Sequence, residues 1–275
     1  QRLQPFPVFH SALKCQCNSR KQAIYVVHTA VANQHRREMI RHTYGLDENQ
    51  YECMFCLFFF TGRPANKIEE KALIDESNRF KDIIVGDFVD TYVNMTIKAL
   101  FWMRFVSTHC SATDIVVKMD DDVAINLRAL THRLPSLQSN GIYGTRWSHQ
   151  PVRRNVTSKW YTPYSLYPFE TFPPYVSGSS YIMCTGTIRR LLERVKYHGQ
   201  YMHIDDVYVT GILANSADVR VIDRSKWWNF MNNSTEYLRR GEVLFALHQN
   251  DENLLKLYHD VHRLTDHRIA TYPPD

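Results

Sequence analysis

The chain has 275 residues, of which 44% are hydrophobic and 13% aromatic, which is enough apolar material for one large core and too much for a disordered tail. Its 33 Lys and Arg residues against 28 Asp and Glu residues leave a net charge of +5 that is spread along the sequence, which argues against a nucleic-acid-binding stripe. No apolar run approaches the roughly 18 residues of a membrane-spanning helix, so we expect a soluble chain in which any signal or anchor is either absent or removed before residue 1.

The first half of the chain alternates β-rich apolar runs with helical patterns. Strands are predicted at 22–29, 53–60, 82–85 and 114–119, and helices at 33–45, 65–80 and 92–108. Because these strands are too apolar to face water, the alternation predicts an α/β fold with a mainly parallel sheet between helices. Ligands of such sheets bind beyond the carboxyl ends of the strands.

The second half is less regular and combines prolines with many aromatic residues. The aromatic residues that we expect in irregular loops here are Trp147, Trp160, Tyr161, Tyr164, Tyr167, Phe169, Phe172 and Tyr175. A strand at 179–184 and helices at 187–195 and 253–264 complete the predicted elements. Without an internal repeat or a low-complexity linker, we expect one domain at 21–265, preceded by a leader at 1–20 and followed by a tail at 266–275.

Cysteines and glycosylation triplets point to an oxidising compartment. The six cysteines are Cys15, Cys17, Cys53, Cys56, Cys110 and Cys184, an even number that is compatible with three disulfides of open connectivity. Zinc binding or thiol catalysis is the less favoured reading, because the close pair at positions 53 and 56 opens a strand instead of a helix. Acceptor patterns for N-glycosylation occur at Asn94, Asn155, Asn232 and Asn233.

The most informative local feature is the segment VVKMDDDV at 116–123. Three consecutive carboxylates do not fit a buried strand and must emerge from its end. Asp120 and Asp122 form a D-x-D pattern whose oxygens suit Mn²⁺ or Mg²⁺, and such an ion bridges to a diphosphate and offsets charge on a departing nucleoside diphosphate. Lys118 either assists this site or balances its charge.

Other readings of the triple aspartate stay open at this point. An acidic loop that caps the following helix explains it equally well. An EF-hand fails, because Ile125 stands where glycine is required and Thr131 where glutamate is required. The nucleophile loop of haloacid-dehalogenase-type phosphatases is an imperfect match, since Ala124 replaces the usual Thr or Val.

A second acidic pair, Asp205 and Asp206, introduces a segment that reads as a helix. One of the two carboxylates is a candidate base, because transfer of a sugar to a hydroxyl group needs an acceptor for the hydroxyl proton. A plain helix cap is the alternative.

Six blocks, in order, resemble motifs of the β-1,3-galactosyltransferase and β-1,3-N-acetylglucosaminyltransferase family, the inverting glycosyltransferase family 31. The blocks are RREMIRHTYG, VGDFVDTYVNMTIK, VVKMDDDV, FPPYVSGSSYIM, IDDVYVTG and LFALHQNDENLLKLY. The chain departs from the family motifs at Tyr44, where Trp is usual, at Ser180, where Gly is commoner, and at Thr210, which reads as an insertion. The resemblance covers about 23–262, nearly the whole chain.

The resemblance implies a GT-A fold, a UDP-sugar donor, Mn²⁺ or Mg²⁺ as cofactor, and inversion to a β-1,3 linkage. It divides the domain into a nucleotide-sugar half at about 21–125 and an acceptor half at about 126–265. It also implies the Golgi lumen, with a type II membrane anchor in the full-length form and no nucleic-acid partner.

Site roles carried over from the family fall into three groups: metal ligands and base, donor binding, and acceptor or sugar binding. Asp122 is expected as a direct metal ligand, Asp120 as a ribose or metal-network contact, His248 as a further metal ligand and Asp206 as the base. Donor binding is expected of Arg37, Arg41, Asp87, Lys98, Lys118 and Asp121. Acceptor or sugar binding is expected of Trp160, Tyr161, Gly178, Ser179 and Asp205. For both lists, structural roles such as solvated arginines, a turn glycine or local aromatic packing stay open.

We therefore expect an inverting hexosyltransferase with galactose as the favoured sugar and N-acetylglucosamine or N-acetylgalactosamine as alternatives. The acceptor glycan is expected on a glycoprotein, a glycolipid or a proteoglycan. The rivals are a sugar-binding homologue without activity and a metal-dependent phosphatase.

Overall fold

The computed structural model describes residues 23–46, 55–110, 114–137, 140–197, 201–230, 235–247 and 249–262. Its centre is a seven-stranded sheet of order β10-β6-β9-β4-β1-β2-β3. The strands are β1 (Ala23–His28), β2 (Phe55–Arg63), β3 (Ile83–Val89), β4 (Ile115–Asp120), β6 (Gly141–Gly144), β9 (Ser180–Cys184) and β10 (Arg220–Asp223). All neighbours pair in parallel except β9, which runs antiparallel to both β4 and β6. The predicted α/β class with a mainly parallel sheet is confirmed.

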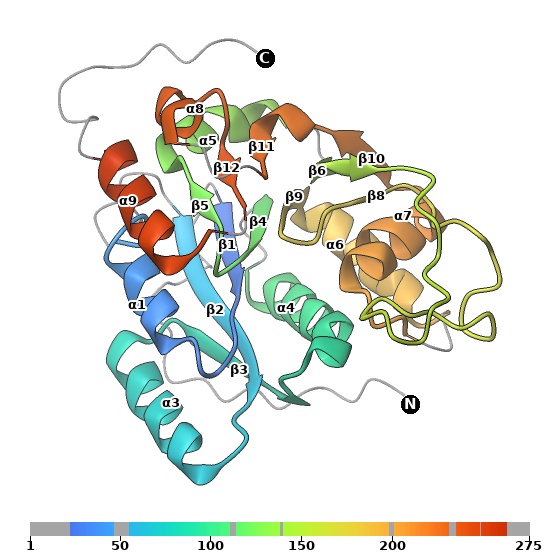
Figure 1. Ribbon diagram of the computed structural model, residues 1–275, viewed down its shortest axis with the longest axis horizontal. Coiled ribbons are helices and arrows are strands. Elements are labelled where there is room, and N and C mark those ends of the chain that lie inside the picture. The colour runs from blue at the N-terminus through green and yellow to red at the C-terminus, as the bar shows by residue number, and fades with distance from the viewer. Residues whose placement is uncertain are drawn as a thin grey trace.

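Helices cover both faces of this sheet (Figure 1). The longer helices are α1 (Gln34–Arg41), α3 (Lys67–Phe80), α4 (Met95–His109), α6 (Thr185–Val195) and α9 (Asp251–His262). The shorter helical elements are η1 (Tyr92–Asn94), α5 (Leu127–Arg133), η2 (Leu134–Ser136), η3 (Val207–Leu213), α7 (Ala214–Ser216), η4 (Ser225–Trp227) and α8 (Thr235–Arg240). In Figure 1, α1, α3 and α9 lie on one side of the central strands and α4 on the other.

Alternation along β1 explains the two layers. Tyr25 and Val27 belong to one buried apolar cluster, which includes residues of α1, α5 and α9. Ile24 and Val26 belong to the other, which includes residues of α4, α6 and η3. Successive side chains of a strand point to opposite faces, so a run that is buried throughout requires cover on both. The apolar strands recognised in the sequence are therefore the middle of a three-layered core.

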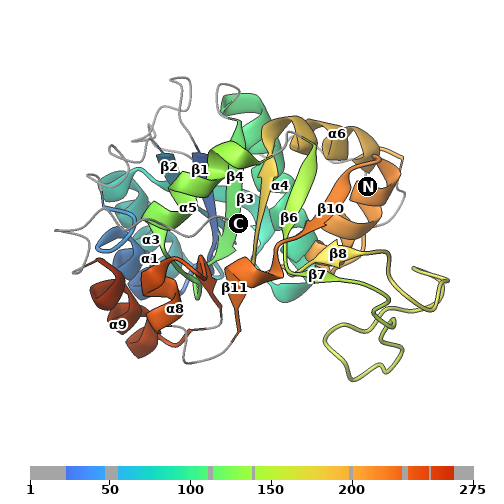
Figure 2. The same ribbon diagram turned by 90° about the horizontal axis from the view of Figure 1, so that it is seen from above.

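Two small sheets bring later segments to the end of β4. β5 (Ala124–Ile125) pairs with β12 (Phe245–Ala246), which pairs with β11 (Trp228–Asn229). β7 (Arg146–Trp147) pairs with β8 (Tyr175–Val176). The loop between β7 and β8 projects from the body of the molecule in Figure 2. These short strands carry segments from the second half of the chain to the carboxyl end of the central sheet.

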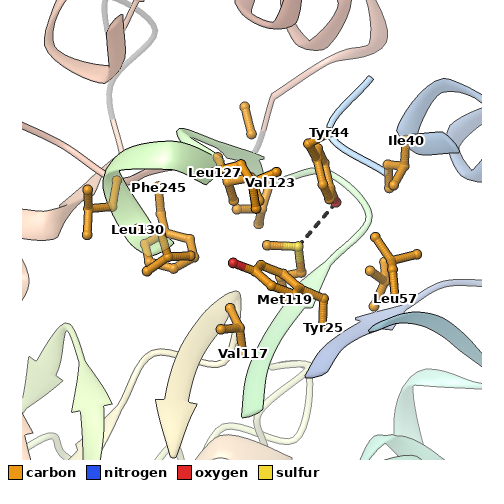
Figure 3. Close-up of a cluster of buried hydrophobic side chains, with 14 of the residues drawn as sticks. Tyr25, Ile40, Tyr44, Leu57, Val117, Met119, Val123, Leu127, Leu130 and Phe245 are labelled. Atoms are coloured by element: carbon orange, nitrogen blue, oxygen red, sulfur yellow. Dashed lines mark hydrogen bonds between the residues drawn. The ribbon is translucent and has the colours of Figure 1, made fainter. Parts of the chain in front are cut away.

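Tyr44 lies in the core beneath the turn that follows β4. Its hydroxyl donates to Met119 Sδ at 3.2 Å (Figure 3). Its ring lies 5.1 Å from that of Tyr258. Tyr258 in turn donates to the carbonyl of Val123 at 3.2 Å. The tyrosine that replaces the usual family tryptophan is therefore a buried packing residue, joined to α9 by an aromatic contact.

Cys184 is a buried thiol that is not part of a disulfide, whereas Cys56 and Cys110 are disulfide-bonded. Three disulfides from the six cysteines are therefore not formed, and Cys15, Cys17 and Cys53 lie outside the described residues. Within the described ranges, no helix has the length and apolar character needed to span a membrane. The predicted domain boundaries stay a prediction.

Candidate active site

The triple aspartate lies where parallel-sheet ligand sites are expected, at the carboxyl ends of β1 and β4. Asp120 is the last residue of β4 and pairs in register with His28, the last residue of β1. Its backbone N–H donates to the carbonyl of Ser179 at 2.9 Å, and that of Asp121 donates to the carbonyl of His28 at 3.1 Å. The acidic turn is thus fixed by backbone hydrogen bonds on both sides.

Asp120 shares a hydrogen-bonded ion pair with a fully buried lysine. Lys118 Nζ lies 2.6 Å from Asp120 Oδ1, also donates to the carbonyl of Gly178, and has a side chain that is only 1% exposed. Burial raises the pKa of Asp120 to about 6, although Lys118 acts in the opposite direction. Despite burial, the neighbouring carboxylates raise the pKa of Lys118 above its ordinary value, so the ammonium group stays charged.

Asp121 faces α1 and not the open end of the sheet. Thr29 Oγ1 donates to its Oδ2 at 2.7 Å, Asn33 Nδ2 donates to the same oxygen at 2.9 Å, and Arg36 Nη1 donates to Oδ1 at 3.2 Å. This arrangement differs from the expectation that Asp121 contacts the donor, because both of its oxygens already accept bonds from the region of α1. Asp121 anchors the turn.

Asp122 is held through its backbone. Its carbonyl accepts the N–H of Gln249 at 2.9 Å, and its charge acts on both Asp120 and Arg36. His248 lies outside the described residues, so its expected part in a metal site stays a prediction. Among the residues that the structure describes, no group of three or more His, Cys, Asp or Glu side chains has a metal-binding arrangement.

The second acidic pair lies beside the first. Gly178 donates its N–H to Asp206 Oδ2 at 3.0 Å, and Val207 donates to Asp206 Oδ1 at 2.8 Å. Burial, reinforced by repulsion from Asp205, raises the pKa of Asp206. Burial also raises the pKa of Asp205, against the attraction of Lys118. Lys118 therefore links the two acidic motifs that the sequence shows as separate.

Gly178 allows this close approach. A Cβ at position 178 would lie 3.2 Å from both Cβ and Oδ2 of Asp206, tighter than most side-chain contacts. The predicted helix after Asp206 begins as a π-helix, η3, in which Thr210 donates to the carbonyl of Asp206 at 2.7 Å and accepts from Val176 at 3.0 Å. A π-helical turn is frequent at functional sites, and here it contains the residue that looks inserted relative to the family.

Aromatic residues and a lysine border the acidic centre. Burial, and then the charges of Asp205 and Asp206, raise the pKa of Tyr92. Lys159 Nζ lies 5.6 Å from the centre of the Tyr92 ring and 4.5 Å from that of Trp160, which is 42% exposed. Tyr161 is half-buried in the same loop. Lys159 thus contacts the rings of both Tyr92 and Trp160.

Arg37 and Arg41 are not directed at this centre. Both guanidinium groups are buried and donate to Glu76, at 2.7 to 2.9 Å, and Arg41 also makes two 2.8 Å bonds to Asp82. The sequence analysis expected donor binding of both side chains. Their charges are instead neutralised by carboxylates of α3 and of the residue before β3.

Two other expected donor residues have structural contacts. Asp87 pairs with Arg63 at 3.1 Å on the edge strand β3, away from β4. Lys98 is buried between Asp90 Oδ1, at 2.7 Å, and the carbonyl of Thr29, at 2.9 Å. Lys98 therefore supports the acidic centre indirectly, through the threonine that holds Asp121.

Sequence reasoning missed His28, Arg36 and Glu76. His28 is buried, its Nδ1 lies 4.0 Å from Asp120 Oδ1, and neither ring nitrogen has a hydrogen-bond partner. Burial lowers its pKa well below the ordinary value, so the ring is neutral. A histidine at the end of an otherwise apolar strand was the available signal for His28. Nothing in the sequence distinguished Arg36 from its arginine neighbour or Glu76 from the other acids of its helix.

Two of the glycosylation triplets lie in described parts of the chain. Asn94 donates to the carbonyl of Val89 at 2.9 Å, and Asn155 accepts from the backbone and hydroxyl of Thr157. Asn232 and Asn233 lie outside the described residues.

Comparison with known proteins identifies the family. The Galactosyltransferase family profile matches residues 35–225. Beta-1,3-galactosyltransferase 1 of Mus musculus and of Homo sapiens are each 33% identical over 233 residues, which cover 82% of this chain and 69% of theirs. Lactosylceramide 1,3-N-acetyl-beta-D-glucosaminyltransferase A of Xenopus laevis is 32% identical over 200 residues, which cover 69% of this chain and 52% of that protein. The chain belongs to the galactosyltransferase family, as the motifs predicted.

Solved structures aligned with this chain are glycosyltransferases of low sequence identity. The galactosyltransferase LGTC, in complex with donor and acceptor sugar analogs, is 10% identical with a TM-score of 0.43, covering 90% of this chain and 98% of its own. A glycosyltransferase involved in glycosylation of the major capsid of PBCV-1 is 8% identical with a TM-score of 0.45, covering 87% and 98%. Family membership and the sheet topology together assign the fold to the GT-A class.

Proposed function

We propose that this protein is an inverting, metal-dependent β-1,3-glycosyltransferase that moves a hexose, with galactose favoured, from a UDP-sugar to the 3-hydroxyl of an acceptor glycan. The observation that carries the proposal is the meeting of two acidic motifs around Lys118, at the carboxyl end of β4, in a chain of the galactosyltransferase family. Transfer of N-acetylglucosamine is the alternative, since a relative named for that activity also matches.

The side-chain oxygens at the acidic centre are of the kind that bind a divalent cation. Asp120 and Asp122 supply carboxylate oxygens of the kind that Mn²⁺ and Mg²⁺ prefer. Two buried groups beside Asp120 or Lys118, the His28 ring and Asp205 Oδ2, have polar atoms without hydrogen-bond partners, as expected of a site that binds a ligand. We propose Asp122 and Asp120 as the described residues that would hold the cation, with His248 as a further ligand. The cation would supply electrostatic stabilisation of the departing diphosphate.

Asp206 is the proposed base. Its raised pKa brings the carboxylate closer to the acidity that suits proton transfer near neutral pH. The N–H groups of Gly178 and Val207 fix both oxygens, so the carboxylate has one orientation toward an acceptor hydroxyl. A single displacement needs this base, an acceptor held opposite the leaving group, and no covalent intermediate.

The acceptor side is proposed to comprise Trp160, Tyr161, Gly178, Ser179 and Asp205. Trp160 offers an exposed aromatic face beside Tyr92, and such faces stack on sugar rings. Lys118 is proposed to keep the carboxylates together and not to contact the donor directly, because it is buried against Asp120 and Gly178. The acceptor glycan belongs to a glycoprotein, a glycolipid or a proteoglycan.

The proposed setting is the Golgi lumen, with a membrane anchor outside this sequence in a type II orientation. The disulfide-bonded cysteines and the glycosylation triplets support an oxidising, glycosylating compartment. The phosphatase and binding-only rivals predict no acceptor-stimulated release of UDP, which separates them from the proposal.

The test measures UDP release from a panel of UDP-sugars with Mn²⁺ or EDTA, with and without β-galactoside, N-acetylhexosamine and mannoside acceptors. We expect release from one donor that requires both metal and acceptor. Asp206→Asn should reduce transfer by about a hundredfold or more while retaining UDP binding, because only the base is lost. Full transfer by this variant would remove Asp206 from the role, and UDP-independent phosphate release would favour the phosphatase.

A further inference from the structure

The arginines of α1 face in different directions. Arg37 and Arg41 pair with Glu76, whereas Arg36 points to the acidic turn and is 24% exposed. Arg36 Nη1 lies 3.2 Å from Asp121 Oδ1, and its Nε lies 3.0 Å from Asp251 Oδ1. One guanidinium group therefore bridges the acidic turn and the first residue of α9.

Asp251 is held from α1 by two adjacent residues. Its second oxygen, Oδ2, lies 2.9 Å from His35 Nε2. Asp251 stands in the first turn of α9, where a carboxylate interacts favourably with the helix N-terminus, and Asn250 caps this helix by accepting the N–H of Asn253 at 2.8 Å. The cap and the His35 contact together hold Asp251 in position to accept the bond from Arg36.

The segment around Asp251 also contacts the acidic turn directly. The N–H of Gln249 donates to the carbonyl of Asp122 at 2.9 Å, and Gln249 is buried. Tyr258 donates to the carbonyl of Val123 at 3.2 Å. Before this segment, β12 pairs with β5, so Ala246 lies opposite Ala124. The segment that contains Gln249 and Tyr258 therefore packs along the acidic turn.

We propose that Arg36, acting through Asp251, is a latch that holds the segment 249–258 against the 120–122 turn and so fixes the orientation of Asp122. Arg36 is a positioning residue, since the contacts that it makes are to Asp121 and Asp251. A guanidinium group suits this task because its fork donates to both carboxylates at once and stays charged at every pH at which the protein folds. The charge of Asp122 acts on the same group, so the latch also balances the turn.

Without this bridge the segment keeps the hydrogen bond from Gln249 to Asp122, the bond from Tyr258 to Val123 and the contact of Asp251 with His35. Asp251 has a side chain that is 45% exposed, so removing its charge leaves the core intact. The latch therefore predicts local opening of the Gln249 amide without general loss of stability.

The test is hydrogen exchange of the Gln249 amide in Arg36→Ala, in Asp251→Asn and in the double variant. Each single variant should raise the exchange rate by at least about fivefold, while amides of β1 such as Val26 stay unchanged. The double variant should exchange at about the rate of a single variant, because either change already breaks the bridge. Arg239→Ala, which removes an exposed ion pair with Glu236 on α8, is the control and should change neither amide.

Unchanged exchange of Gln249 in both single variants would overturn the latch, as would effects that multiply in the double variant. If Arg36→Ala does not fold, exchange of the Gln249 amide in Asp251→Asn alone tests the latch. A second readout rests on the proposed function: Mn²⁺-dependent UDP affinity should fall in both variants by a similar factor. Absence of UDP binding in the unaltered protein would count against the proposed function alone, because the exchange result needs no ligand.

Discussion

Asp205 and Asp206 are neighbours in the chain, yet their surroundings differ. Both oxygens of Asp206 accept backbone N–H groups, while Asp205 Oδ2 has no hydrogen-bond partner. Two carboxylates in one buried place do not ionise independently, and the one with oriented donors is the better defined proton acceptor. This difference favours Asp206 as the proposed base. We infer that Asp205 acts on the reaction by raising the pKa of Asp206.

Asp205→Asn should therefore alter the pH dependence of transfer. Repulsion from Asp205 is the second cause, after burial, of the raised pKa of Asp206. Removing that charge lowers the pKa of Asp206, so the acid limb of kcat/KM against pH moves toward lower pH. On that limb the relative activity rises by up to about tenfold for each unit of displacement.

The measurement is a full pH profile of kcat/KM for both proteins, with Asp218→Asn as the control, because Asp218 is exposed and lies outside the acidic centre. An acid limb that stays in place would show that Asp205 does not adjust the base. A limb that moves toward higher pH would exclude Asp206 as the titrating group.

At the scale of elements, the loop between β7 and β8 depends on one arginine. Arg154 donates to the carbonyls of Thr162, Tyr167 and Phe169 at 2.7 to 2.9 Å, and its guanidinium group lies 3.7 Å from the centre of the Tyr164 ring. Backbone hydrogen bonds close the base of the loop, such as that from the Val152 N–H to the carbonyl of Glu170 at 2.9 Å, and Arg154 joins carbonyls farther along it. The same loop carries Lys159 and Trp160 to the border of the acidic centre.

Arg154→Ala should raise the KM for the acceptor by about tenfold or more while leaving UDP affinity unchanged, because several charge-assisted bonds are lost away from the donor side. Cleavage of the loop by a protease should also become faster. Arg153→Ala is the matched control, since it removes the neighbouring, exposed positive charge. An unchanged acceptor KM with faster proteolysis would separate loop order from acceptor binding and contradict the proposed acceptor side.

The elements that sequence patterns predicted are those with strong periodicity. The apolar strands of the first half and the helices between them occur near the expected positions, because burial on both faces leaves an unmistakable apolar run. β6, β10 and the two-residue strands were not predicted. Their pairing is set by neighbours distant in sequence, and residues such as Arg220–Asp223 carry no apolar signal of their own.

At the scale of the whole molecule, one buried carboxylate joins two helices to the sheet. Glu76 of α3 accepts from Arg37 and Arg41 of α1, and Arg41 extends the network to Asp82 and lies over the ring of Phe80. The two guanidinium groups lower the pKa of Glu76 in spite of its burial. This network accounts for Arg37 and Arg41, two of the three arginines of the first family block.

Glu76→Gln should lower the free energy of unfolding by about 3 to 5 kcal/mol, because it leaves two buried guanidinium groups without their shared carboxylate. The pKa of Glu76 is lower in the folded protein, so its contribution is present above the unfolded pKa and is lost as the pH falls through the folded value. The variant should therefore lose less stability than the original protein on acidification. Urea unfolding at several pH values measures both effects, with Glu70→Gln on the exposed side of the same helix as control. A difference below about 1 kcal/mol would show that the network is not a main support of the fold.

The chemistry of the site was visible in the sequence to a greater extent than its arrangement. Carboxylates that end apolar strands or begin helices are conspicuous, so the D-x-D and the second acidic pair were found. Distinguishing Arg36 from Arg37 requires the rotation of α1 about its axis, which depends on Glu76 approaching from another helix. The roles assigned to these side chains stay predictions that the experiments above decide.

The π-helical turn at 207–213 has a consequence for the history and engineering of this chain. A residue added to an ordinary helix rotates everything beyond it by about 100° around the axis. A widened turn takes up the addition locally, so the helix continues into the core with its apolar face unturned, while Asp206 before it keeps its place. Deleting Thr210 would therefore tighten the turn and withdraw the hydroxyl that joins it to β8, instead of displacing the whole element. The π-helical turn therefore allows a residue to be inserted or deleted after Asp206 without rotating the helix that follows it.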